Sequence, residues 1–359
     1  MRVLFDAYWW VKGPVSNRQV MRELVRHWLA AFPDDEPVLV VRHRDRESAV
    51  ADLPAGARVV STRLWPHGVA AIAAYPWHAR RVRADLTLTH NFTPAVGRSA
   101  VFVHDVMFQT NPEWFTRAER LYFALIPLML PRADVVLTSS ATEARRIGRL
   151  NRRARPVHPV GLAVGTELAN APRTRPEGIA DGERFLLSVG RLNVRKNLAF
   201  TFDAALRSGA LHPDRPLVVV GESQGRGIEL DPAIGEAVDA GLIRFLGRID
   251  DGELAWLYAN ADTFVYLSLD EGFGLPPLEA LTFGCPVLVS DIAVFRENLG
   301  DQATFVDPHD LDAAAAAFAA IPAEPARVTD ARLPTWDGCV RAMVAAIRGS
   351  LPRRVTSRS

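Results

Sequence analysis

The chain has 359 residues, of which 48% are hydrophobic and 23% are charged, and its formal net charge is +1. This length and balance predict a globular protein with two domains of ordinary size, and no stretch reaches the roughly 20 apolar residues that a membrane span needs. The chain opens directly into an expected strand, so we expect no signal peptide. Cys285 and Cys339 give no disulfide framework, which favours a cytoplasmic protein.

The small net charge hides an asymmetry between the two halves of the chain. Residues 1–175 hold 25 Lys and Arg against 15 Asp and Glu, a balance of +10, and residues 176–359 hold 17 against 26, a balance of −9. A basic half suits an acidic partner such as an anionic membrane surface or a phosphate-bearing acceptor, unless its arginines simply take the place of lysines. Lys12 and Lys196 are the only two lysines, against 40 arginines. No basic run is interleaved with aromatic residues, so we expect no nucleic-acid partner.

The first part of the chain alternates short apolar runs with helical stripes. Strands are expected at 2–8, 37–41, 58–61, 85–89, 99–103 and 133–138. Helices are expected between them at 18–31, 68–83, 117–130 and from 141 onward. This alternation predicts a parallel sheet that is buried on both faces.

The pattern breaks around 151–183, where arginine, proline and glycine dominate, and this stretch is expected to be a linker and loop. A second alternation follows, with strands expected at 185–189, 217–220, 243–246, 263–269, 287–290 and 303–306. An amphipathic helix is expected over 334–349, and the tail from Pro352 is expected to be disordered. The chain is therefore predicted to be an α/β protein with two doubly wound, Rossmann-like units, a class that binds ligands at the carboxyl ends of its strands.

The most informative stretch is 271–279, Glu-Gly-Phe-Gly-Leu-Pro-Pro-Leu-Glu. It joins an expected strand to the start of an expected helix, and its two glycines let the backbone turn tightly and approach a ligand. The amino end of a helix suits an anion such as a diphosphate. Two carboxylates eight positions apart suit a ligand with many hydroxyl groups, Glu279 on a ribose and Glu271 on a sugar. The same pattern also fits an ordinary strand, turn and helix with two solvated glutamates.

The spacing of Glu271 and Glu279 around GFGLPPLEA resembles the E-x7-E signature of family 4 of the retaining, nucleotide-sugar-dependent glycosyltransferases. The resemblance implies the GT-B fold, in which two Rossmann-like domains face a central cleft. It also implies that the backbone of Phe273, Gly274 and Leu275 contacts the transferred sugar. No metal or other cofactor is implied, because a nucleotide-diphosphate sugar is the co-substrate and no Asp-x-Asp metal motif is present.

A basic loop follows the first strand of the second unit. Arg191 and Lys196 lie five positions apart, so a guanidinium and an ammonium group could hold a diphosphate from two sides as it leaves. The pair resembles the arginine and lysine with which the family clamps the nucleotide diphosphate. Gly190 belongs to the same turn, and Arg195 is a plausible third donor.

The resemblance implies further residues beside the donor. After the strand at 243–246, Arg248 and Ile249 would lie beside the nucleobase. In the first unit, His104 and Asp105 end a strand and precede a Pro-Glu-Trp-Phe stretch found in mannosyl- and rhamnosyltransferase relatives. His104 would hydrogen-bond the transferred sugar from the acceptor side, and Asp105 would orient the local backbone.

Gly13, in the loop after the first strand, would let the backbone approach the leaving phosphates. This loop departs from the family pattern. Family loops carry further glycines here, whereas this chain has Pro14, which stiffens the loop.

The predicted protein is a retaining, metal-independent hexosyltransferase whose donor is a nucleotide-diphosphate sugar, with GDP-mannose favoured. Its acceptor would be a glycan, a glycolipid or a small molecule. Two alternatives stay open: a GT-B-fold nucleotide-sugar 2-epimerase and a catalytically silent partner subunit that binds nucleotide sugars. The basic first half also leaves open a peripheral contact with the inner face of an anionic membrane.

The predicted domain order follows from these assignments. Residues 1–160 form the acceptor-side domain, 161–183 the linker, and 184–333 the nucleotide-sugar-binding domain. Residues 334–350 form a helix that crosses back to the first domain, and 351–359 form a tail.

Overall fold

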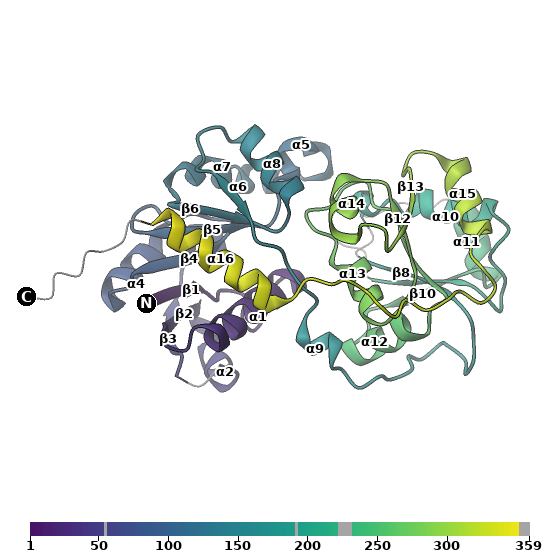
Figure 1. Cartoon of the computed structure of the whole chain (residues 1–359), viewed down its shortest axis with the longest axis horizontal. Coiled ribbons are helices and arrows are strands. Elements are labelled where there is room, and N and C mark those ends of the chain that lie inside the picture. The colour runs from purple at the N-terminus through teal and green to yellow at the C-terminus, as the bar shows by residue number, and fades with distance from the viewer. Residues whose placement is uncertain (54–55, 191–192, 222–231, 352–359) are drawn as a thin grey trace, which may run out of the picture. The chain divides into compact units, whose positions relative to one another are not determined.

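The computed structural model describes residues 1–53, 56–190, 193–221 and 232–351, which form two compact units (Figure 1). The first unit comprises Met1–Leu162 together with the chain from Pro334 onward, and the second comprises Ala163–Leu333. Each unit is built around its own sheet and its own apolar core.

The first unit contains a seven-stranded parallel sheet with the order β3-β2-β1-β4-β5-β6-β7. Its strands are β1 (Arg2–Asp6), β2 (Glu36–Arg42), β3 (Arg58–Thr62), β4 (Leu86–His90), β5 (Ser99–Val103), β6 (Val135–Thr138) and β7 (Val157–Pro159). The central strands are buried along nearly their whole length, as expected for a parallel sheet with both faces covered.

Short helices connect the strands of the first unit. They are α1 (Val15–Ala31), α2 (Arg46–Ala51), α3 (His67–Val69), α4 (Tyr75–Val82), α5 (Met107–Thr110), α6 (Arg117–Phe123), α7 (Leu125–Met129) and α8 (Ala141–Leu150). Single turns precede or extend some of them, namely η1 (His43–Asp45), η2 (Ala70–Ala74), η3 (Pro112–Trp114) and η4 (Leu130–Arg132). Side chains fix two of the helix starts: Thr116 and Glu119 form a capping box at α6, and Ser140 accepts from the Glu143 N–H at α8.

The last helix, α16 (Trp336–Ser350), groups with the first unit and lies beside α1 (Figure 1). It begins at Thr335, whose hydroxyl accepts from the Gly338 N–H. One face of the helix is apolar and buried, through Trp336, Cys339, Val340, Met343, Val344 and Ile347. The ring of His27 in α1 stacks on the ring of Trp336, so the packing between the two helices includes an aromatic contact.

The second unit contains a six-stranded parallel sheet with the order β10-β9-β8-β11-β12-β13. Its strands are β8 (Leu186–Val189), β9 (Leu217–Val220), β10 (Ile243–Gly247), β11 (Thr263–Tyr266), β12 (Val287–Ser290) and β13 (Thr304–Val306). Its helices are α9 (Thr166–Ala169), α10 (Leu198–Arg207), α11 (Pro232–Asp239), α12 (Asp251–Asn260), α13 (Leu275–Thr282), α14 (Ala293–Leu299) and α15 (Leu311–Ala319), with the turn η5 (Val194–Lys196) before α10.

Several elements differ from the sequence-based expectation; for example, the strand expected over 2–8 ends at Asp6. The strand expected over 263–269 ends at Tyr266, and the Leu269 N–H donates to the carbonyl of Arg195 at 2.9 Å. The stretch 151–183, expected as linker and loop, contains β7 and α9. Both elements are three or four residues long, too short for a hydrophobic period to reveal. In the part of the chain that the structure describes, no helix is long and apolar enough to cross a membrane.

The packing of α16 makes a prediction about stability. Ile347 is fully buried, so Ile347→Ala should lower the free energy of unfolding of the first unit by about 2–5 kcal/mol. Arg341 is exposed on the same helix, and Arg341→Ala should change it by no more than about 0.5 kcal/mol. Urea unfolding followed by circular dichroism measures both. Equal stability of the two variants would show that α16 does not contribute to the core.

Candidate active site

The loops after β8 and β11 are joined at the carboxyl end of the second sheet. These strands are neighbours in the sheet, so their following loops lie at the same edge. The loop after β8 leads into η5, where Asn193 accepts from the Lys196 N–H at 3.3 Å. The Leu269 N–H of the other loop donates to the Arg195 carbonyl. This backbone contact places Arg195 and Lys196 against the stretch that begins at Glu271.

Glu271 joins the two basic side chains. Lys196 Nζ lies 2.7 Å from Glu271 Oε1, and Arg195 Nη1 lies 2.8 Å from Glu271 Oε2. The hydroxyl of Tyr266 donates to Oε1 at 3.0 Å and also contacts the Lys196 ammonium. Only 7% of the Glu271 side chain and 10% of the Lys196 side chain are exposed. The result is a buried cluster of two cations, one carboxylate and one phenol.

The charge state of Glu271 follows from these partners. Burial alone raises the pKa of a carboxyl group, because it disfavours the charged form. Here the positive charges of Arg195 and Lys196, with hydrogen bonds from Lys196 and Tyr266, outweigh burial and lower the pKa of Glu271 to about 2. Glu271 is therefore a carboxylate at neutral pH.

The turn between Glu271 and α13 requires a glycine at position 274. Gly274 has φ of +87°, a left-handed conformation that residues with a side chain rarely adopt. A Cβ atom there would lie 2.4 Å from Cε1 of Phe295. Phe273 is buried, its carbonyl accepts from Asn298 Nδ2 at 2.6 Å, and Leu275 begins the helix. The amino end of α13 is thus fixed by packing and by a hydrogen bond.

Glu279 lies in α13 in a different environment. It is 8% exposed, and Tyr258 donates its hydroxyl to Glu279 Oε2 at 2.9 Å. Burial raises the pKa of Glu279 to about 7, because the hydrogen bond from Tyr258 and the more distant charge of Lys196 offset only part of the desolvation. Glu279 is therefore partly protonated at neutral pH and can both donate and accept hydrogen bonds.

The other residues predicted for this site occupy the same sheet edge or lie outside the described chain. Gly190 follows β8, and its N–H donates to the Val220 carbonyl at 2.9 Å. Arg248 is exposed and Ile249 is half-buried directly after β10. Arg191 lies outside the residues that the structure describes.

In the first unit, His104 follows β5 and pairs with a second histidine that the sequence analysis did not identify. His104 Nε2 lies 3.2 Å from Nδ1 of His90, and the two rings are stacked at 5.3 Å. Burial is the main reason that the pKa of His104 is lowered to about 3 and that of His90 to about 4. Both rings are therefore neutral at pH 7, and the N–H of one ring donates a hydrogen bond to the bare nitrogen of the other.

This histidine pair is next to a buried acid, Asp6, which the sequence analysis also did not identify. Asp6 ends β1 and accepts from the Tyr75 hydroxyl at 2.7 Å, from the His90 N–H at 3.2 Å and from Nε2 of His67 at 2.7 Å. Burial opposes its ionisation, but His67 and His90 outweigh it, and the pKa of Asp6 lies well below its ordinary value. Asp6 and His90 end two parallel strands of the sheet that His104 also follows, and this shared position is the signal that could have identified them.

Two further predicted residues belong to the first unit: Asp105 follows His104, and Gly13 lies in the loop after β1. Asp105 accepts from the Met107 N–H at 3.1 Å and so closes the turn after His104. Gly13 is exposed, and its Cα packs so closely on the ring of Trp9 that a Cβ atom would lie 2.5 Å from it. A side chain at position 13 would therefore displace Trp9.

The second unit can serve as an anion site coupled to hydroxyl recognition. Lys196 and Arg195 are held at a carboxylate, and both can exchange part of that contact for phosphate oxygens. The carboxylate of Glu271 and the partly protonated Glu279 are suited to hydroxyl groups. No group of three His, Cys, Asp or Glu residues that could hold a metal is found among the described residues.

Comparison with solved structures defines the class of fold. The chain is similar to sucrose-phosphate synthase from Thermosynechococcus elongatus, with a TM-score of 0.65, 18% identity, and coverage of 97% of this chain and 94% of that chain. It is also similar to Anabaena HepE in complex with UDP-glucose, with a TM-score of 0.60, 17% identity, and coverage of 96% and 100%. The two parallel α/β sheets match those of GT-B glycosyltransferase structures, so the predicted fold is confirmed.

Sequence comparison then gives a match to a known family over part of the chain. Residues 172–331 match the family Glycosyl transferases group 1. The chain is 31% identical over 232 residues to the O-antigen chain mannosyltransferase B of Escherichia coli, and the match covers 61% of this chain and 60% of the relative. It is 29% identical over 224 residues to the O-antigen chain mannosyltransferase RfbU of Salmonella typhimurium, with coverage of 62% and 60%. The matches span about 60% of the length of both relatives. The resemblance to the group 1 glycosyltransferases is confirmed.

The raised pKa of Glu279 makes a prediction about stability and pH. The folded-state pKa of about 7 lies above the ordinary value of 4.5, so the folded protein keeps a proton that the unfolded chain releases. The free energy of unfolding of the second unit should therefore fall by up to roughly 3 kcal/mol as the pH rises from about 4.5 to about 7. Glu279→Gln, which stays neutral, should remove this decline in urea unfolding.

Glu271→Gln is the matched control for this measurement. Glu271 has a lowered pKa of about 2, so its contribution to stability is lost only as the pH falls from about 4.5 toward 2. Replacing it should leave the slope between about pH 5 and pH 7 unchanged. If Glu279→Gln declines as steeply as the unmodified protein, Glu279 is not the group that binds the proton.

Proposed function

We propose that this protein is a retaining, metal-independent glycosyltransferase. It moves a sugar from a nucleotide-diphosphate sugar to a glycan, a glycolipid or a small-molecule acceptor. The observation that carries the proposal is the cluster of Lys196, Arg195 and Glu271 at the carboxyl ends of β8 and β11. It combines cations for a diphosphate and a carboxylate for sugar hydroxyls at one sheet edge. The family match over residues 172–331 supports it.

In the proposed mechanism, the basic side chains stabilise the leaving group. The bond from the anomeric carbon to the diphosphate oxygen breaks, and negative charge grows on that oxygen. Lys196 and Arg195, with Arg191 as a further donor, hold this charge through preorganised hydrogen bonds. The same cluster aligns the sugar, because Glu271 accepts from its hydroxyl groups and the backbone at 273–275 contacts it.

The acceptor attacks the same face from which the diphosphate departs. The acceptor oxygen forms the new bond to the anomeric carbon, and its proton passes to an oxygen of the departing phosphate. The configuration is therefore retained, and no protein base is needed on the opposite face. His104 hydrogen-bonds the transferred sugar as a neutral ring, which is consistent with its lowered pKa of about 3.

The remaining residues recognise the nucleotide. Glu279, which can donate or accept at neutral pH, holds the ribose hydroxyls. Arg248 and Ile249 follow β10 and lie beside the base in our assignment. Gly190 lets the loop backbone approach the phosphates. Asp105 keeps the turn after His104 in place, and the hydrogen bond that it accepts from the Met107 N–H supports this role. Gly13 is assigned to the phosphate side of the donor.

We favour GDP-mannose as the donor because the two curated relatives described above are named mannosyltransferases of O-antigen chains. A lipid-linked or glycan acceptor is consistent with those names. We place the protein in the cytoplasm, in peripheral contact with the inner membrane face.

The proposal predicts donor hydrolysis that depends on Glu271. Incubation with a panel of GDP-, UDP-, dTDP- and ADP-sugars should release one nucleoside diphosphate slowly, and Glu271→Ala should reduce this release by on the order of 100-fold or more. Asp270→Ala is the matched control, because it removes the neighbouring carboxylate, which accepts from the Glu271 N–H, and leaves the side chain of Glu271 in place. Its rate should stay within about threefold of the unmodified protein.

The products also separate the alternatives. Release of a nucleoside diphosphate with a free sugar of unchanged anomeric configuration supports a retaining glycosyltransferase. A donor recovered with its sugar inverted at C2 would identify a 2-epimerase instead. Tight nucleotide binding without any turnover, with or without acceptor, would identify a silent partner subunit, and the absence of nucleotide binding would refute the proposal.

A further inference from the structure

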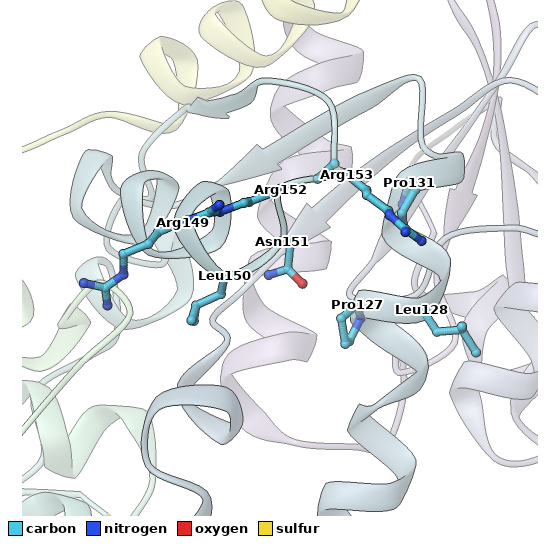
Figure 2. A pocket seen from close by; sticks show the side chains of 9 residues that line it. Pro127, Leu128, Pro131, Arg149, Leu150, Asn151, Arg152 and Arg153 are labelled. Atoms are coloured by element: carbon cyan, nitrogen blue, oxygen red, sulfur yellow. The ribbon is translucent and has the colours of Figure 1, made fainter.

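The first unit carries an exposed surface that the glycosyltransferase mechanism does not use. It lies between α7, with the turn that follows it, and the end of α8 (Figure 2). Seven residues define what we call the α7–α8 surface: Pro127, Leu128, Pro131, Arg149, Leu150, Arg152 and Arg153. Together with Asn151 and Ala154 they line a shallow hollow of about 370 Å³. Figure 2 shows Arg153 extending toward Pro131 across the hollow.

The apolar part of this surface projects into solvent. The Leu128 side chain is 63% exposed and that of Leu150 is 37% exposed. Leu121, seven positions before Leu128, is 78% exposed. Backbone hydrogen bonds from the Ala124 N–H to Arg120 and from the Leu128 N–H to Ala124 continue the helical path from α6 into α7, so Leu121 and Leu128 lie on one helical face.

The polar part of the surface is strongly basic. Between residues 120 and 166 the sequence holds eight arginines and only two acids, Asp134 and Glu143. Neither acid lines the α7–α8 surface: Asp134 accepts from the Ser99 N–H, and Glu143 is fully buried and pairs with Arg146. The arginines of the surface at 149, 152 and 153 are all exposed.

We propose that the α7–α8 surface docks the protein on an anionic lipid bilayer. Exposed leucines can enter the boundary between headgroups and acyl chains, and arginines around them can meet lipid phosphates while their aliphatic stems stay against apolar surface. Charge complementarity selects anionic lipid, because each arginine near such a membrane strengthens binding. No aromatic residue lines the hollow, which argues against a nucleic-acid strand that would need stacking platforms.

The inference deepens the proposed function, because it rests on the peripheral membrane contact proposed there, but it does not depend on glycosyl transfer. It identifies the residues that would make the peripheral membrane contact. If the acceptor is lipid-linked, docking would keep the enzyme in the two-dimensional plane where that acceptor is found. If the acceptor is soluble, the surface would still bind vesicles, so the two proposals can fail separately.

Vesicle sedimentation tests the inference. The full chain is mixed with phosphatidylcholine vesicles or with vesicles of phosphatidylcholine and phosphatidylglycerol in equal parts. We expect co-sedimentation with the anionic vesicles only, weakened by salt. The triple variant R149Q/R152Q/R153Q should bind on the order of 100-fold more weakly, since each arginine contributes a factor of roughly five. Leu128→Asp should also weaken binding, because it removes the apolar insertion.

A matched triple variant at the opposite edge of the sheet controls for net charge. Arg44, Arg46 and Arg58 are exposed on or beside β2 and β3, at the far end of the strand order from β6 and β7. R44Q/R46Q/R58Q removes the same charge and should bind vesicles as the unmodified protein does. Donor hydrolysis is measured on the same preparations and should be equal in both triple variants. Equal rates would show that both variants are folded.

Three results would overturn the inference. They are no binding to anionic vesicles by the unmodified protein, equal binding to both vesicle types, and equal loss of binding in the two triple variants. The last would mean that overall charge, and not the α7–α8 surface, determines the interaction.

Discussion

The second unit depends on one buried ionic contact, in which the Glu271 carboxylate holds both Lys196 and Arg195. Two cations without it would repel each other in a site that excludes much of the water, and burying a charge without a partner is costly. The carboxylate therefore makes it possible to keep two cations side by side at the sheet edge. Because the two cations come from the loop after β8 and the acid from the loop after β11, the contact also joins the loops of neighbouring strands.

Glu271 and Glu279 show that different surroundings can shift the pKa values of two identical side chains in opposite directions. Both are buried, yet the pKa of Glu271 is lowered to about 2 and that of Glu279 is raised to about 7. The Glu271 carboxylate accepts from two cations and one tyrosine hydroxyl, whereas Glu279 accepts from one tyrosine hydroxyl. Glu271 stays charged and holds the two cations. Glu279 can act as donor or acceptor, which suits a hydroxyl group, because a hydroxyl can also do both.

The sequence was enough to predict the two parallel sheets, because each strand is a short apolar run between helical stripes. It also predicted the glycine turn at Gly274, which the left-handed φ and the contact with Phe295 explain. It did not predict that Lys196 contacts Glu271, since the contact joins residues 75 positions apart. His90 was missed for a similar reason: a histidine at a strand end becomes informative only when His104 is placed beside it. The assigned roles of these residues stay predictions.

Nucleoside diphosphate binding, measured by calorimetry on Lys196→Met and Glu271→Gln, tests the central claim most directly. If Lys196 holds the diphosphate and Glu271 only keeps it in place, Lys196→Met should weaken binding by roughly 10-fold or more. Glu271→Gln keeps both cations but removes the carboxylate that holds them together, so it should weaken binding by a smaller factor, about threefold. If Lys196→Met bound the nucleotide as tightly as the unmodified protein, the Lys196, Arg195 and Glu271 cluster would not be the diphosphate site.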